Sequence, residues 1–519
     1  MEQFRRTIKK QVPGRRMTDQ FYVDGDVNVP DAKGDISQII YSKGLLKIED
    51  MKVVDHYIRV SGKVQYQILY QEDGNELHMS SLQGKLSFEE MVYADEEPKG
   101  PVFLRDGSVE LSVSMIHSRK VNVKAMVEME ITSSGEESDV ITLDVEEESG
   151  MYKKRTDKTF LELVLSKKDS YRIKEEMKLP NTKETIGSIL FSDVEPRKFD
   201  TRITEDEMIV RGELLVFVMY ESVEGKVDWT EQIVPYEGRI PCSGADDTMY
   251  HHMQASFCDE VIDVRMDEDG EMRLVGVEVT MEMRMSVYGE TQYECLEDVY
   301  SLHRNLVLQE EPVKISRLVL QSGSKYKLEE ALSVPELRDG MLQMCHVSGN
   351  LKIEHTETVA DGVMAEGVLS IHILYVKAND DSPFEIWQGM VPFTHVIECP
   401  GMKTDMEYEI TEALEQLSVN VLGNGEMQVH AGIGFTIFLT EVQEFINITE
   451  IDEQPFASNE IENMPGVVGY VVKDGDELWT IAKRFHTTMQ SIRMVNQMET
   501  DVLKAGAKIL IFKENMSIL

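Results

Sequence analysis

A short strand-like string recurs three times along the chain, and this repetition limits the folds open to it. "GKVQYQILY" at residues 62–70 returns as "GELLVFVMY" at 212–220 and "GVLSIHILY" at 367–375. Pro30, Pro180 and Pro335 each stand forty residues before the closing tyrosine. The copies are therefore related without gaps by offsets of 150 and 155 residues. Self-similarity of this kind indicates one structural unit present three times.

The local pattern within each unit predicts β-strands. Apolar and polar residues alternate through the first string, and the period of two is typical of a half-buried antiparallel strand. The glycine that opens each string (Gly62, Gly212 and Gly367) predicts a bulge or a close backbone approach. A second long alternating strand closes each unit, beginning near Lys120, Leu274 and Met427.

These patterns predict a mainly β protein. We expect three repeated β-sandwich or barrel-like domains, each with a short helix near its proline ("PDAKGDISQII" in the first). The expected divisions are a basic N-terminal arm at 1–20, repeats at 21–150, 165–310 and 320–450, a linker at 451–466, and a small terminal domain at 467–515. The unpaired edges of long strands invite pairing with other chains, so the repeats are candidate assembly surfaces.

Charge and composition exclude several classes of protein. The formal net charge is −41, from 53 basic and 94 acidic residues, which disfavours nucleic-acid binding and anionic lipid. No run of apolar residues is long enough to span a bilayer, and no signal peptide follows the basic start, so we expect no membrane insertion and retention inside the cell. The five cysteines are widely spaced without a CxxC pair, which fits a reducing compartment and predicts no metal site.

Few residues outside the tail are candidates for chemistry. Cys242 and Cys399 occupy the same place in the second and third repeats, which predicts packing positions. His251 and His252 form the histidine pair of a predicted loop, and we expect them to be solvated. A cysteine peptidase would need a cysteine and a histidine brought together in a cleft. We therefore expect no enzyme, no cofactor and no catalytic residue.

The tail from about residue 466 has a different character. "GYVVK" predicts a strand, Asp474-Gly475-Asp476 a turn, and the residues after it two short helices before a final strand "KILIF". Asp476 is expected to cap the first helix and Thr487 or Thr488 the second. Leu478, Ile481, Ala482 and Phe485 form one apolar stripe, and Trp479 is expected in the core. The order is β-α-α-β.

This tail resembles a LysM domain in its run of residues. Tyr470, Gly475, Asp476, Leu478, Trp479, Ile481, Ala482, Asn496, Gly506 and Ile509 fill the family's motif positions, whereas Glu477 stands where the family often has threonine or serine. LysM domains commonly bind N-acetylglucosamine polymers. The resemblance implies a groove, for glycan or for a partner protein, formed by Gly475, Asp476, Glu477, Leu478, Gln497 and Met498.

Three β repeats with a segment such as "SRKVNVKA" (residues 118–125), followed by one LysM domain, resemble the SipL family of coat morphogenesis proteins of spore-forming clostridia. The repeat is similar to the SPOCS domain of that family. The resemblance implies a non-enzymatic scaffold in the mother-cell cytoplasm, at the forespore and spore coat surface. Its implied partners are the SpoIVA-like basement ATPase, contacted through LysM, and other coat proteins.

Two alternatives remain open at this point. A wall-associated or phage-tail protein would use the same LysM domain to grip N-acetylglucosamine glycans of peptidoglycan. A wall hydrolase would need catalytic carboxylates, but acidic residues are so frequent here that their proximity signals nothing.

Overall fold

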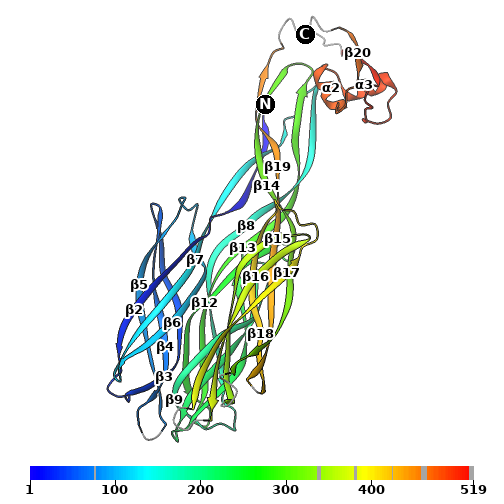
Figure 1. Ribbon diagram of the computed structural model, residues 1–519. Helices are drawn as coiled ribbons and strands as arrows, with labels where there is room; N and C mark the ends of the chain where they lie inside the picture. Colours follow the sequence, from blue (N-terminus) through cyan, green and yellow to red (C-terminus); the bar gives the residue numbers. More distant parts are fainter. Residues whose placement is uncertain (75–76, 336–340, 379–382, 424, 457–464, 514–519) are drawn as a thin grey trace.

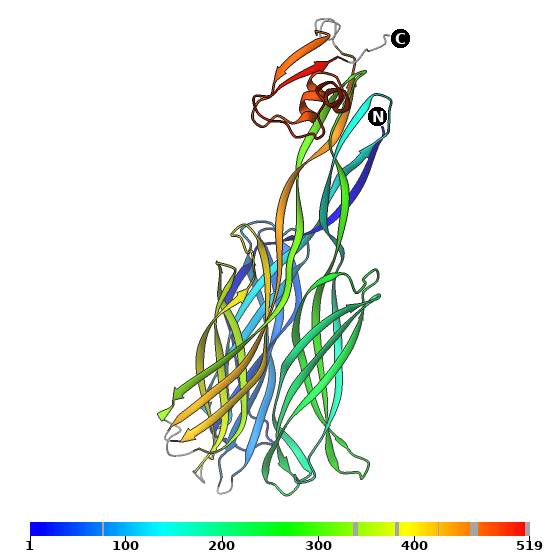
Figure 2. The same cartoon turned by 90° about the vertical axis from the view of Figure 1, so that its right-hand side faces the viewer.

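The computed structural model describes the chain except for residues 75–76, 336–340, 379–382, 424, 457–464 and 514–519. Figure 1 shows elongated β domains side by side, a stalk of long strands rising from one end, and a small helical domain at the tip of the stalk. Figure 2 shows the same arrangement from the side. The mainly β fold and the small terminal domain are as predicted.

Each repeat is a sandwich of two antiparallel sheets, and each sheet has three strands except the second sheet of repeat 1, which has a fourth. The first sheets are β3-β4-β5, β9-β10-β11 and β15-β16-β17. Their strands are β3 (Ile36–Val54), β4 (Tyr57–Glu72), β5 (Met79–Tyr93), β9 (Ile186–Thr204), β10 (Glu207–Ser222), β11 (Val227–Pro241), β15 (Met341–Val359), β16 (Gly362–Lys377) and β17 (Phe384–Glu398).

The second sheets are centred on the long strand that closes each repeat. Their strand orders are β2-β7-β6, β8-β13-β12 and β14-β19-β18. These strands are β2 (Met17–Asn28), β6 (Val102–His117), β7 (Lys120–Val145), β8 (Met151–Lys178), β12 (Tyr250–Met266), β13 (Met272–Ser301), β14 (Asn305–Ser333), β18 (Glu407–Gly423) and β19 (Glu426–Gln454).

The repeated glycine marks both a bulge and a close approach, as predicted. A Cβ on Gly62 would lie 2.5 Å from the Lys47 carbonyl oxygen and 2.7 Å from the Phe88 ring. The register of β3 shifts directly opposite this glycine. Phe393 covers Gly367 in the same way, and Tyr236 covers Gly212. In each repeat, an aromatic ring thus packs against the backbone of the glycine.

The expected short helix after the proline is wrong where the structure describes it. In the first two repeats the chain makes a turn, closed by the Lys33 amide donating to the Pro30 carbonyl at 3.0 Å and by Lys183 donating to Pro180 at 2.9 Å. Strands β3 and β9 begin directly afterwards. The segment is too short to propagate a helix, and the sheet takes up its apolar residues.

The N-terminal segment is not a solvated arm. Its strand β1 (Gln3–Pro13) pairs antiparallel with the C-terminal half of β7, and the Ile8 side chain is 5% exposed. β1 and β2 together therefore correspond to one long strand, β8 or β14, of the later repeats. Of the basic residues in β1, Arg5, Arg6 and Lys9 are exposed and Lys10 is half-buried.

Paired extensions of the long strands build the stalk. β1 with β7, β8 with β13, and β14 with β19 each form a two-stranded ribbon beyond the sandwiches. β8 and β14 run unbroken through residues 151–164 and 311–319, which the sequence had placed between repeats. Side chains from all three ribbons share apolar clusters: Ile8, Ile141, Phe160, Cys295 and Ile315 in one, and Val145, Leu296, Val299, Leu306, Ile448 and Ile451 in the other.

The three sandwiches meet around a common axis. Equivalent residues of the three copies, Leu69, Met219 and Leu374, are buried in one shared cluster, and burying each such side chain contributes about 1.5–3 kcal/mol. Beside the cluster lies a cavity of about 2100 Å³, lined mainly by β3, β6, β9, β12, β15 and β18. In the sheets as described, each of these six strands pairs on one side only, so their open edges face the cavity between the repeats.

Candidate functional site

The terminal domain has the expected β-α-α-β order. Strands β20 (Val467–Val471) and β21 (Lys508–Phe512) pair antiparallel, and helices α2 (Leu478–Arg484) and α3 (Met489–Asn496) lie between them in sequence. The Thr488 hydroxyl accepts from the Ser491 amide and caps α3, as predicted. The Asn496 side chain bonds both the amide and the carbonyl of Leu510 at 2.7 Å, which fixes the end of α3 against β21.

The turn before α2 differs from expectation in one respect. Gly475 has a φ of +83°, which glycine adopts without strain. Asp476 does not cap α2. Its carboxylate accepts from the Lys473 amide at 2.7 Å and from the Tyr470 hydroxyl at 2.8 Å, and these bonds lower the pKa of Asp476. Glu477 occupies the cap position without a side-chain bond to the helix.

Five of the six residues of the predicted groove lie in the two loops before α2 and after α3, and the sixth, Leu478, is the first residue of α2. Gly475, Glu477 and Gln497 are exposed, Asp476 and Met498 are half-buried, and Gln497 adopts the left-handed conformation that ends α3. Leu478 is only 2% exposed and belongs to the domain core. Its side chain therefore cannot offer an apolar surface to a sugar, whereas the other five positions remain open at least in part.

A contact that the sequence did not reveal holds this domain on the stalk. The Trp479 indole donates to Asp298 of β13 at 2.8 Å, and the Lys483 ammonium lies 2.5 Å from the same carboxylate. The Tyr300 hydroxyl donates to the Thr487 carbonyl at 2.9 Å, and its ring lies edge-on to Trp479 at 4.9 Å. Trp479, expected in the core of the tail, therefore packs at the junction with the stalk.

The same junction reaches the predicted groove. The Lys154 ammonium of β8 lies 3.0 Å from the Glu477 carboxylate and 2.7 Å from that of Glu297. Tyr300 and Leu302 of the stalk are buried in one cluster with Leu478, Ile481 and Ile492. The domain is docked through a shared core, so the stalk sets the direction in which the groove opens. The predicted linker at 451–466 falls partly on β19 and partly on residues 457–464, outside the described residues.

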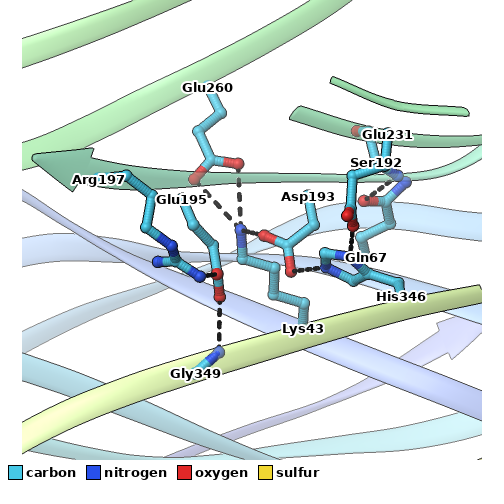
Figure 3. A network of polar contacts seen from close by, with 10 residues as sticks. All are labelled: Lys43, Gln67, Ser192, Asp193, Glu195, Arg197, Glu231, Glu260, His346 and Gly349. Atoms are coloured by element: carbon cyan, nitrogen blue, oxygen red, sulfur yellow. Dashed lines mark hydrogen bonds and ion pairs between the residues drawn. The ribbon is translucent and has the colours of Figure 1, made fainter. Parts of the chain in front are cut away.

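A second concentration of polar groups lies where the repeats meet at the axis (Figure 3). Lys43 and Asp193 occupy equivalent positions in the first and second repeats, and the Lys43 ammonium lies 2.5 Å from Asp193 and 3.2 Å from Glu260. Burial opposes the charge on Asp193, but the attraction of Lys43 and bonds from His346 lower its pKa. The equivalent residue of the third repeat is Ser348, so the copies have diverged into complementary partners.

His346 links the second and third repeats within this network. Its imidazole lies 2.6 Å from Glu231 and 3.2 Å from Asp193, and it stacks on Phe217 at 4.2 Å. Burial disfavours the charged ring, yet the hydrogen bonds and the nearby carboxylates raise the pKa of His346 to about 9. Glu195 accepts from the Gly349 amide at 3.0 Å. The network is buried and internally paired, which suits holding repeats together.

The remaining candidates are structural. Cys242 and Cys399 are fully buried, and their amides donate to the equivalent Asp206 and Asp361 carbonyls, so the prediction of packing positions is confirmed. His251 and His252 do not lie in a solvated loop. They lie in strand β12 beside the axial cavity, where burial lowers the pKa of both.

Comparison with known proteins agrees with this architecture. A family model described as the SipL SPOCS domain matches residues 35–128, 185–266 and 341–422, one segment in each sandwich. A LysM domain model matches residues 470–512. No solved structure matches the chain. Within the described residues, no helix is both long and apolar enough to cross a membrane.

Both kinds of domain are binding or scaffold modules, and together they indicate a sporulation-related protein with a peptidoglycan-binding type of domain. The SPOCS matches include strands that meet at the axis between the repeats. The LysM match covers the terminal domain that is docked on the stalk. The chain is therefore a SipL-type protein, made of three SPOCS domains and a C-terminal LysM domain.

Proposed function

We propose that this protein is a non-enzymatic scaffold of the spore coat, which settles on the forespore surface in the mother cell. The observation that carries the proposal is the separation of two kinds of surface. Three sandwiches form the body, while the LysM domain is held at the far end of the stalk by Trp479, Asp298 and Tyr300 (Figure 1). Such a shape suits a molecule that is anchored at its tip and presents its body to other coat proteins.

The LysM loops are the proposed contact with a SpoIVA-like basement ATPase. Gln497 and Met498 follow α3, and within the described residues no hydrogen bond or ion pair joins their side chains to the stalk, whereas Glu477 is paired with Lys154. The full chain carrying Gln497→Ala with Met498→Ala should lose co-precipitation with the ATPase and the fluorescent ring around the forespore. Val502→Ala, at a 75% exposed site elsewhere in the domain, is the matched control. An undiminished ring in the double variant would contradict the assignment of these loops.

Glycan binding is the second candidate function, and the LysM match itself favours it. Gly475, Asp476 and Gln497 can offer backbone amides, a carboxylate and a carboxamide to acetamide groups. Retention of the purified full chain on peptidoglycan, without other proteins, would support this function. Passage through the peptidoglycan without delay, together with capture by the basement ATPase, would leave the protein contact as the role of the domain.

A further inference from the structure

The outer face of sheet β3-β4-β5 carries an exposed apolar corner at the end where β4 begins. Tyr57 and Tyr93 are cross-strand partners whose rings lie 5.5 Å apart, and they are 43% and 57% exposed. Val54 and Met91 beside them are also exposed. We call these four residues, with Lys52 and Arg59 in the adjoining row, the repeat 1 corner.

This corner is basic in a strongly acidic protein. Lys52, Arg59 and Met91 form one cross-strand row on the outer face. Lys52 is 2.7 Å from Asp50, but no ion pair within 4 Å joins Arg59 to any residue that the structure describes. Asp50 and Glu89 lie in the next row inward, and the hydrogen bond from Lys52 together with the positive charges of Lys52 and Arg59 lowers the pKa of Asp50. Tyrosine rings beside an arginine are typical of interface anchors.

The other repeats provide an internal comparison, because their sheets have the same register. In repeat 2, Arg239 lies 3.3 Å from Glu207 and Arg211 lies 2.8 Å from Glu237, whereas the exposed Arg202 has no ion pair among the described residues. Glu207 and Pro241 stand where repeat 1 has Tyr57 and Tyr93, so the second repeat lacks the pair of tyrosine rings.

The third repeat carries the opposite charge at these positions. Glu357 is equivalent to Lys52, and it adjoins Met364 and the 42% exposed Val396. Glu366 and Glu398 flank this row. None of the three glutamates has an ion pair among the described residues. We call these five residues the repeat 3 corner.

The fold itself shows what this face of repeat 1 binds. Further along the same outer face, Lys43 is held by Asp193 and Glu260 of repeat 2, and Lys47 by Asp259. Carboxylates on two strands of a SPOCS domain, β9 and β12, are therefore already its partners within the chain. The repeat 1 corner continues that surface to the exposed end of the sheet.

We propose that the repeat 1 corner binds the repeat 3 corner of a second copy of this chain. The two corners differ, so the contact is heterologous and can propagate from copy to copy instead of stopping at a symmetric dimer. The net charge of −41 makes copies repel at long range, but exposed charges are largely screened beyond about 10 Å at 0.1 M salt. The contact then depends on local complementarity and apolar burial.

Three variants, each altered at the equivalent of Lys52, test the proposal by sedimentation velocity of the full chain. The repeat 1 variant combines Lys52→Glu with Tyr93→Ser, the repeat 3 variant is Glu357→Lys, and the control is Arg202→Glu, the repeat 2 equivalent of Lys52. The unaltered chain and the control should form larger species as concentration rises. Each corner variant should stay monomeric over the same range, with self-association weakened about tenfold or more.

Mixing the two corner variants distinguishes this contact from other kinds of association. Each variant keeps one intact corner, so an equimolar mixture should form dimers that do not grow further. Failure of the mixture to dimerise, equal association by all variants, or a monomeric unaltered chain at every concentration would overturn the proposal. The altered residues are exposed, and unchanged melting temperatures would show that the variants fold.

Discussion

Single residues at the axis show how three copies of one unit become a specific assembly. Tyr41, Phe191 and His346 are equivalent, as are Lys43, Asp193 and Ser348. Three lysines or three aspartates at the second set would repel one another, and three histidines at the first set would leave buried polar atoms unpaired. The substitutions place a lysine beside a carboxylate and a histidine between two carboxylates. The three copies therefore share one backbone fold, whereas their residues at the axis differ and pair with one another.

The raised pKa of His346 predicts a pH dependence of stability. Its folded value is about 9, against an ordinary value near 6.5. The protonated ring therefore stabilises the fold fully below about pH 6.5, and this contribution is lost as pH rises through 9. We expect the melting temperature to fall over that range, for a loss of roughly 3 kcal/mol at most.

His346→Gln should flatten this decline, and His355→Gln, at an exposed site in the same repeat, should leave it unchanged. Melting temperatures of the three proteins at pH 6, 7.5 and 9 give the measurement. Parallel curves for the His346 variant and the unaltered chain would show that this histidine does not link repeats 2 and 3 through its charge.

Among the elements, the docked helix α2 has the largest consequence for function. The sequence pattern predicted its apolar stripe, and Leu478, Ile481 and Ala482 are buried as expected. The contacts of Trp479 and Lys483 with the stalk could not be predicted, because their partner Asp298 is distant in sequence and no local sequence pattern links it to them. A tryptophan in a short amphipathic helix is equally consistent with a core and with an interface.

Removing the shared carboxylate should loosen the junction. Asp298→Ala leaves the Trp479 indole and the Lys483 ammonium without their acceptor, at a cost of about 1–3 kcal/mol. We expect faster amide hydrogen exchange in residues 478–488 and 298–303, with the sandwiches unaffected. Asp269→Ala, in an exposed turn, serves as the control. Equal exchange in both variants would mean that the other junction contacts, those of Tyr300 and Lys154, hold the domain without Asp298.

At the scale of the whole molecule, the stalk depends on all three repeats at once. Each ribbon is only two strands wide, and an isolated pair of strands is marginally stable in water. Packing Ile8, Ile141, Phe160 and Ile315 together gives the three ribbons one core. Asn447 reinforces it by accepting from the Thr142 amide at 2.9 Å and donating to the Val140 carbonyl at 3.0 Å.

Neighbouring residues of β1 offer a matched test of this bundle. Ile8→Asp places an unpaired charge in the stalk core and should cost several kcal/mol locally, whereas Lys9→Asp alters the exposed face. Hydrogen exchange of residues 134–145 should rise strongly in the first variant and little in the second. Similar protection in both would contradict a core shared by the three ribbons.

Local patterns were sufficient to predict the repeated unit, its strands, the bulge opposite Gly62 and the β-α-α-β order of the tail, because alternation, glycine positions and helix caps act over a few neighbouring residues. The LysM domain was predicted from the resemblance of the tail to that family. The meeting of the repeats around an axis, the use of residues 3–13 as a stalk strand, and the docking of Trp479 on Asp298 were decided by tertiary structure. These contacts join segments far apart in the chain, and their energy depends on shapes and charges that exist only once the strands have folded.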